Sequence, residues 1–395
     1  MRLLRIAIFA VVTVAGIIVG TALLTSWESR QPRTLPSPSG PYSVGRRSFV
    51  WRDDSRLDPL SPDSSAGREI FVWAWYPAAP RTDSRPAQYL PPSWLQAYHL
   101  QRFEQKLDRV HAHAIDEAPI SGIHPSYPVL IFSPGGGQLP THYTALLEDL
   151  ASHGYIILAV AHPFITPVVV FPDGRVARWG PGFVRMEAPE IVMIQAADLI
   201  SVAGHAIREH ARNEAFFAHI DPQRIGVFGH SLGGAAAAEA CALDARLKAG
   251  MDLDGTVFGD VLTAGVRQPF FLMMAAGIPR PDLPGFRRPP PRFDPNHDKG
   301  TLHEDMFLEH SAIAYRLSVR RLSHMNFSDK GFFFEPEDRL AELLRIQMDA
   351  KQTTRLASGY IRAFFGEYLM AIHNPGGELD RAPNAQMNLE IHRLP

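Results

Sequence analysis

The chain alternates between two patterns of hydrophobic and polar positions. Short runs of consecutive apolar residues are typical of strands buried on both faces of a sheet, and apolar residues at every third or fourth position are typical of covering helices. The first pattern predicts strands at 69–76, 127–132, 155–161, 225–228, 247–255, 269–275 and 313–322. The second predicts helices at 141–153, 187–212, 234–244, 336–350 and 353–372. This alternation predicts an α/β fold, with a mostly parallel central sheet flanked by helices.

Residues 6–24 depart from this alternation, because they are apolar and uncharged over about nineteen positions, enough to span a bilayer as a helix. They exceed the hydrophobic region of an ordinary signal peptide, and no clear cleavage site follows them. Arg2 and Arg5 precede them and favour a cytoplasmic N-terminus. We therefore expect residues 1–25 to be an uncleaved transmembrane signal anchor, with the following domain outside the cytoplasm, periplasmic or extracellular. Secretion after cleavage of a signal peptide is the alternative.

The remaining chain divides into three parts by composition. Residues 26–44 hold four prolines among small polar residues and predict an extended linker. Residues 45–372 carry the α/β pattern, and 373–395 form a C-terminal tail. Within the domain, 91–117 is rich in aromatic and charged residues and predicts a helical insertion. Residues 279–298 hold seven prolines and predict either a rim or lid over a site or a solvated surface loop.

Composition excludes some classes of function. The formal net charge is −2, from 39 Lys and Arg against 41 Asp and Glu, and no long run carries one sign. A nucleic-acid partner is therefore not expected, since a phosphate-binding face needs clustered cations. The single cysteine, Cys241, allows no disulfide within the chain and is expected to pack as a small hydrophobic residue.

The segment Gly229-His230-Ser231-Leu232-Gly233-Gly234 lies between a predicted strand and a predicted helix. A serine in such a strand–turn–helix segment has a strained backbone that exposes its hydroxyl at the carboxyl end of the sheet. The glycines allow the tight turn and the close approach of strand and helix. Because a serine hydroxyl needs a base to become a nucleophile, this segment predicts Ser231 as one member of a catalytic triad in an α/β-hydrolase fold.

In this fold the acid and then the histidine follow the serine along the chain. Asp254 comes at the end of the strand-like segment 247–255 and is our choice for the acid, with Asp252 as the alternative. His324 directly follows the last predicted strand and is our choice for the base. The other histidines after Asp254 occupy positions less suitable for a catalytic base, namely His297, His303, His310, His373 and His392.

An oxyanion intermediate needs N–H donors. One is expected from Leu232, directly after the nucleophile, and another from the glycine-rich loop after strand 127–132, with Gly136 preferred and Gly135 next. His162, at the end of a strand, and His230 are expected to contact substrate. No metal or cofactor is expected: the pair His111 and His113 lacks a third ligand, and no phosphate-binding motif is present.

Five segments carry a family resemblance: 132–137, 149–155, 229–234, 253–258 and 323–329. Through them the chain resembles, over roughly residues 45–370, the platelet-activating factor acetylhydrolase family of α/β-hydrolases, the lipoprotein-associated phospholipase type. The resemblance implies a Ser231–Asp254–His324 triad and an oxyanion hole from the Gly136 and Leu232 amides. It also implies a metal-independent esterase for short or oxidised acyl groups, such as those at the second position of phospholipids.

Two departures from the family lie near the expected site. Pro134 stands where the family usually has His, and Thr256-Val257 stand where it usually has Trp-Met. A peptidase, amidase or thioesterase would use the same triad. A non-catalytic binding protein on a hydrolase scaffold would instead need a broken triad, whereas all three residues are present.

Overall fold

The computed structural model describes residues 31–98, 104–276, 298–333, 347–373, 377–381, 384 and 386–394, together with Gly16 and Gly20. Apart from Gly16 and Gly20, the predicted transmembrane or signal helix lies outside the described residues, as do most of the predicted 336–350 helix and the proline-rich segment up to residue 297.

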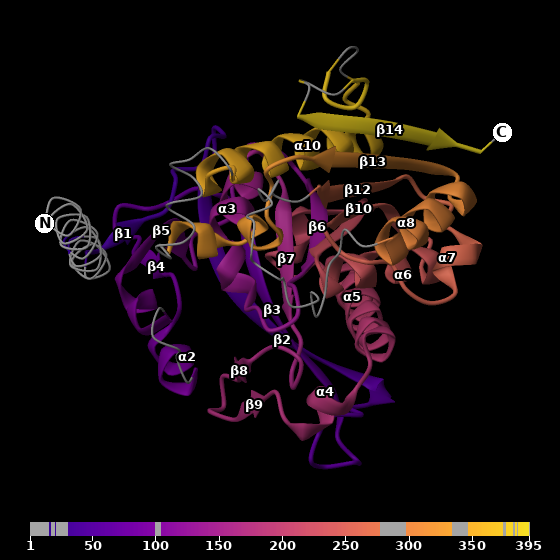
Figure 1. Ribbon diagram of the computed structural model, residues 1–395. Coiled ribbons are helices and arrows are strands. Elements are labelled where there is room, and N and C mark those ends of the chain that lie inside the picture. Colours follow the sequence, from indigo (N-terminus) through magenta and orange to yellow (C-terminus); the bar gives the residue numbers. More distant parts are fainter. Residues whose placement is uncertain are drawn as a thin grey trace, which may run out of the picture.

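One twelve-stranded sheet, shown in Figure 1, runs through the molecule in the order β1-β5-β2-β3-β7-β6-β10-β11-β12-β13-β14, with β4 paired to β5. Strands β6, β7 and β10 to β13 are parallel, whereas β2, β3 and β14 pair antiparallel with neighbours. The bounds are β1 Arg33–Thr34, β2 Ser43–Leu57, β3 Gly67–Ala78, β4 Pro86–Gln88, β5 Val110–Asp116, β6 Tyr127–Ser133, β7 Ile156–Ala161, β10 Ile220–His230, β11 Leu247–Leu253, β12 Phe270–Ala275, β13 Ile313–Val319 and β14 Met387–Arg393. A separate hairpin holds β8 Val168–Val170 and β9 Val176–Arg178.

Helices cover both faces of this sheet, and each face has its own hydrophobic core. Figure 1 shows α3 and α10 on one side and α5, α6 and α8 on the other. The helix bounds are α2 Pro92–Ala97, α3 Thr144–Ser152, α4 Pro181–Arg185, α5 Ala188–Ala211, α6 Leu232–Leu243, α7 Val261–Ala264, α8 Asp298–His310 and α10 Ala350–Met370. Short 3-10 turns are η1 Glu104–Arg109, η2 Pro140–Tyr143, η3 Phe217–His219, η4 His324–Phe327 and η5 Asp329–Phe332.

Among the described residues, α5 alone has the length and apolar composition that a bilayer-crossing helix needs. More than half of its apolar window is nevertheless buried inside the protein, where residues such as Val192 and Leu199 pack in the core. An amphipathic core helix explains this composition.

The structure confirms the α/β fold, and the predicted strands and helices that it describes coincide with observed elements to within a few residues. The helical prediction for 91–117 is wrong at its end, because Val110–Asp116 forms strand β5. That segment alternates His111 and His113 with smaller residues, and its pairing with β1, β2 and β4 decides its conformation. The sequence patterns also did not predict β2, which has many polar residues, or β14 in the C-terminal tail.

Part of the predicted linker packs on the domain. Leu35 is 2% exposed, and its carbonyl lies 2.8 Å from the Nε2 atom of His113. The backbone N–H of Ser39 donates to Asp149 at 2.7 Å, and that of Gly40 donates to the Ser152 hydroxyl at 2.9 Å. The described residues from 31 onward therefore contribute contacts that a fragment beginning at residue 45 would lack.

Candidate active site

Ser231 lies in a sharp turn between β10 and α6. Its φ of 56° and ψ of −125° belong to a region that side-chain-bearing residues rarely adopt. The turn depends on glycines: a Cβ on Gly229 would lie 2.2 Å from the Gly233 carbonyl oxygen, and one on Gly233 would lie 2.2 Å from the Ser133 carbonyl oxygen. The strain and the close packing present the Ser231 side chain, which is partly exposed, at the edge of the sheet.

The structure brings Ser231, Asp254 and His324 together from three separate loops. The Nε2 atom of His324 lies 3.1 Å from the Ser231 hydroxyl, and its Nδ1 atom lies 2.7 Å from Oδ2 of Asp254. Asp254 is held by a second hydrogen bond, because its Oδ1 accepts from the backbone N–H of Ala275 at 2.7 Å. A carboxylate at Nδ1 keeps the proton there, so Nε2 can accept the proton of the Ser231 hydroxyl.

Asp252, the alternative acid, does not contact His324. It lies under the turn, where its Oδ1 accepts from the backbone N–H of Gly255 at 2.8 Å and its Oδ2 has no hydrogen-bond partner among the described residues. Burial raises its pKa well above the ordinary range, and the nearby charge of Asp254 raises it further. Because Asp252 makes no hydrogen bond with His324, it does not orient the catalytic imidazole.

Gly136 and Leu232, the two predicted oxyanion donors, lie against each other. A Cβ on Gly136 would come within 2.9 Å of the Leu232 Cδ1 atom. Within the described part of the chain, neither backbone N–H donates to another protein group. The Gly135 amide, the second choice, is already engaged, since it donates to the Tyr143 hydroxyl at 3.1 Å. The geometry therefore favours Gly136 over Gly135.

His230 and His162, for which the sequence predicts substrate contacts, lie beneath the site instead. His230 is 1% exposed and His162 is 0% exposed. The ring nitrogens of His230 face the Tyr143 hydroxyl at 2.7 Å and the His324 carbonyl at 2.9 Å. Both ring nitrogens of His162 are likewise occupied by protein groups. Burial and these protein partners leave neither side chain exposed to a substrate in this structure.

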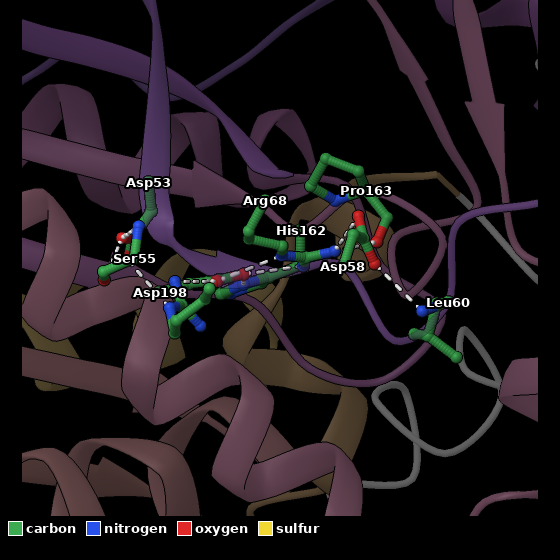
Figure 2. A network of polar contacts seen from close by, with 9 residues as sticks. Asp53, Ser55, Asp58, Leu60, Arg68, His162, Pro163 and Asp198 are labelled. Atoms are coloured by element: carbon green, nitrogen blue, oxygen red, sulfur yellow. Dashed lines mark hydrogen bonds and ion pairs between the residues drawn. The ribbon is translucent and has the colours of Figure 1, made fainter. Parts of the chain in front are cut away.

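His162 belongs to a buried network of charges that the sequence analysis missed (Figure 2). Asp198 on α5, fully buried, accepts from the Arg68 guanidinium at 2.7 and 3.1 Å and lies 2.9 Å from Nδ1 of His162. Arg56 reaches the same carboxylate at 2.9 Å, and Asp58 accepts from Arg68 at 2.9 Å. Two charged residues could have indicated this network. Arg68 directly precedes the predicted strand 69–76, and Asp198 lies within the predicted helix 187–212.

Burial alone would raise the pKa of the Asp198 carboxyl, but the charge of Arg68 and the hydrogen bonds from His162 and Arg68 outweigh it. The pKa of Asp198 is therefore held well below its ordinary value. Burial lowers the pKa of His162. We infer a neutral imidazole with its proton on Nδ1, facing the carboxylate, so Nε2 accepts from the Ser133 hydroxyl at 3.0 Å. Ser133, His162 and Asp198 thus form a second serine–histidine–aspartate chain.

This second chain differs from the first in exposure. Ser133, His162 and Asp198 are all 0% exposed, whereas the His324 side chain is 37% exposed. No substrate can reach the Ser133 hydroxyl without unfolding of its surroundings. The second chain is therefore structural: it ties the carboxyl ends of β6 and β7 to α5.

The sheet order and the strand–turn–helix at Ser231 define the α/β-hydrolase class. Within it, residues 28–164 and 193–280 match the sequence model of the family described as platelet-activating factor acetylhydrolase, isoform II. The chain belongs to this family. The matched residues include Ser231 and Asp254, and His324 lies beyond them.

Named relatives agree with this family. The chain is 27% identical over 259 residues to a probable 1-alkyl-2-acetylglycerophosphocholine esterase of Arthroderma benhamiae, covering 59% of this chain and 61% of the relative. It is 26% identical over 292 residues to a platelet-activating factor acetylhydrolase of Canis lupus familiaris, covering 64% and 62%. The matches thus span less than two thirds of these relatives.

A solved structure is similar over nearly the whole chain. It is a ferulic acid esterase from Streptomyces cinnamoneus, with a TM-score of 0.73, 28% sequence identity, and coverage of 91% of this chain and 99% of that one.

We expect Asp198→Asn to destabilise the protein strongly, because Arg68 and Arg56 would lose the charge that compensates them in a buried site. Breaking a buried ion pair costs about 3–5 kcal/mol, which corresponds to a fall in Tm of roughly 5 °C for a domain of this size. Thermal unfolding measures the effect. Asp173→Asn, which removes an exposed partner of Arg175, is the control and should leave Tm unchanged. Equal Tm values for the two variants would contradict the structural role of the network.

Proposed function

We propose that the protein is a serine-dependent carboxylic ester hydrolase, with Ser231 as nucleophile, His324 as general base and Asp254 as the acid that orients it. The single observation that carries this proposal is the continuous hydrogen-bonded chain from Asp254 through His324 to Ser231, at 2.7 and 3.1 Å. The family and the named relatives, an esterase and an acetylhydrolase, support it.

In the proposed reaction, the Ser231 oxygen attacks the ester carbonyl carbon while Nε2 of His324 takes the hydroxyl proton. The carbonyl oxygen becomes an oxyanion that accepts hydrogen bonds from the Gly136 and Leu232 amides. When the carbon–oxygen bond to the leaving group breaks, His324 returns the proton to the departing alcohol and an acyl-enzyme remains. Water, deprotonated by His324, then attacks the acyl-enzyme and releases the acid and free Ser231.

Short or oxidised acyl esters, including those at the second position of phospholipids, are the substrate class we propose. The names of the relatives from Arthroderma benhamiae and Canis lupus familiaris support it, since both describe hydrolysis of an acetylated lipid or factor. Nothing among the described contacts favours a peptide, amide or thioester over an ester.

An aromatic ester is a second candidate substrate, and one feature of the site favours it. The rings of Trp179 and Phe183 stack with centroids 5.8 Å apart, and Trp179 is 48% exposed. A Cβ on Gly137 would lie 3.2 Å from the Trp179 ring, which places this aromatic pair beside the proposed oxyanion loop. An exposed aromatic surface there can stack on an aromatic acyl group, as in the ester named for the similar ferulic acid esterase.

We propose further that residues 1–25 anchor the protein in a membrane, with the catalytic domain outside the cytoplasm. The uncharged apolar run at 6–24 and the preceding Arg2 and Arg5 support this location.

Ser231→Ala should lower kcat by at least about three orders of magnitude, because the acyl-enzyme can no longer form. Hydrolysis of p-nitrophenyl acetate and labelling by a fluorophosphonate measure the loss. Ser133→Ala, in the buried chain, should still take up one equivalent of label. Retained turnover in Ser231→Ala, or label on another residue of the wild-type protein, would overturn the proposed function.

The two substrate candidates predict different effects of Trp179→Ala. If the aromatic pair holds an aromatic acyl group, kcat/KM for methyl ferulate should fall by about tenfold while that for p-nitrophenyl acetate changes little. Unchanged kcat/KM for both esters would remove the aromatic candidate. A 2-acetyl phospholipid and a 2-oxidised-acyl phospholipid, assayed beside them, test the lipid candidate directly.

The anchor proposal predicts that the full chain sediments with membranes and resists extraction at pH 11. Replacing two residues of the apolar run, Val14→Arg and Ile17→Arg, should release it into the soluble fraction, because each cation costs about 3 kcal/mol at the centre of a membrane helix. Arg33→Lys, outside the run, is the control. A soluble product of the wild-type gene that has lost its N-terminal segment would instead support the cleaved signal.

A further inference from the structure

A third hydrogen-bonded chain, distinct from the two serine–histidine–aspartate chains, runs beneath the proposed site from the oxyanion loop to the base. The backbone N–H of Gly135 donates to the Tyr143 hydroxyl at 3.1 Å, and this hydroxyl lies 2.7 Å from Nδ1 of His230. The Nε2 atom of His230 lies 2.9 Å from the carbonyl oxygen of His324. Two side chains therefore connect the residue next to Gly136 with the backbone of the proposed base.

The direction of each hydrogen bond in this chain follows from protonation. Burial lowers the pKa of His230 well below its ordinary value, and the nearby charge of His324 lowers it further, so the ring is neutral. Burial raises the pKa of Tyr143, which keeps its proton. Because the carbonyl of His324 can only accept, the single ring proton of His230 is on Nε2. Nδ1 is then an acceptor, and Tyr143 donates to it while accepting from Gly135.

Packing leaves these two side chains little freedom to move. Tyr143 is 0% and His230 is 1% exposed. The Tyr143 ring lies 4.8 Å from that of Phe132, and the His230 ring lies 4.5 Å from that of His324 and 5.6 Å from that of Phe327. Gly135 also has no room for a side chain, since a Cβ there would come within 2.8 Å of Nδ1 of His230.

His324 needs such a support, because its backbone lies in the short turn η4 rather than in the sheet. Gly136 similarly lies in a loop, one residue beyond Gly135. A displacement of about 1 Å between reacting groups can cost a hundredfold in rate. Gly136 and His324 belong to segments after β6 and β13, which are not neighbours in the sheet, so no strand pairing sets their separation directly.

We propose that Tyr143 and His230 are positioning residues that hold the oxyanion loop and the base loop at a fixed separation during ester hydrolysis. This inference rests on the proposed function. Neither residue touches substrate: Tyr143 acts through the Gly135 amide, and His230 acts through the backbone of His324.

Tyr143→Phe tests the inference, because it removes only the hydroxyl. We expect kcat for p-nitrophenyl acetate to fall about 10- to 100-fold, which does not exceed the fall caused by removing one oxyanion donor. KM should stay within about twofold of the wild-type value. Affinity for an alkyl trifluoromethyl ketone, which forms a tetrahedral oxyanion adduct with the nucleophile, should fall by a similar factor. Rates are expressed per fluorophosphonate-reactive site, so that misfolded protein does not count.

Tyr127→Phe is the matched control. Tyr127 is also buried, and its hydroxyl also accepts from a backbone N–H, that of His124 at 3.4 Å, and donates to a carbonyl, that of Ser121 at 3.1 Å. Tyr127 lies at the start of β6, whose other end leads into the oxyanion loop. We expect a comparable fall in Tm and unchanged kcat, KM and ketone affinity.

Two substitutions of His230 separate the two ends of the chain. The amide of Asn reaches about as far as Nδ1, so His230→Asn can keep an acceptor for Tyr143 while losing the donor to His324. The amide of Gln reaches about as far as Nε2, so His230→Gln keeps the donor and loses the acceptor. We expect His230→Gln to weaken ketone binding as Tyr143→Phe does. His230→Asn should instead slow fluorophosphonate labelling about tenfold or more, because the base is displaced.

The inference is overturned if Tyr143→Phe and His230→Gln lower Tm as Tyr127→Phe does but keep wild-type kcat and ketone affinity. If Tyr143→Phe does not fold, His230→Gln alone decides between these outcomes. An active Ser231→Ala variant would overturn the proposed function itself, which is a different result from loss of the positioning effect.

Discussion

Parallel pairing of β10 between β6 and β11 is the constraint on which the rest of the site depends. In this register Gly229 lies opposite Ser133 on one side and Asp252 on the other. The chain therefore leaves all three strands at the same edge of the sheet. The oxyanion loop, the serine turn and the acid loop start side by side there, before any side-chain contact forms. Glycines at 229 and 233 permit the approach, because a Cβ at either would overlap backbone atoms.

Polar groups near this edge of the sheet are buried in two different ways, either as charged pairs or as neutral hydrogen-bonded side chains. In the network around α5, Arg68 and Asp198 are charged and paired, so their desolvation is offset by strong mutual attraction. Beside the serine, His230 and Tyr143 are neutral and joined by directed hydrogen bonds. A buried cation next to His324 would oppose the positive charge that the base acquires during proposed catalysis. Neutral partners give rigidity without that cost.

The two serine–histidine–aspartate chains show why residue type alone does not define an active site. Both have similar distances between their members, and both include residues at the carboxyl ends of strands. They differ in solvent access and in backbone conformation, since Ser231, unlike Ser133, lies in a strained turn with positive φ. Exposure at the sheet edge, rather than the presence of a triad, distinguishes the candidate nucleophile from the structural serine.

Local patterns in the sequence determined the alternation of strands and helices, the turn at Ser231 and the order in which Asp254 and His324 follow it. These features depend on residues close together in the chain, so periodicity and glycine spacing reveal them. Only the tertiary structure decided that β5 and β14 are strands, that His162 and His230 point into the protein, and that Arg68 meets Asp198. Those outcomes depend on contacts between distant segments, and burial turns a side chain of the same chemical type into either a substrate contact or a structural support.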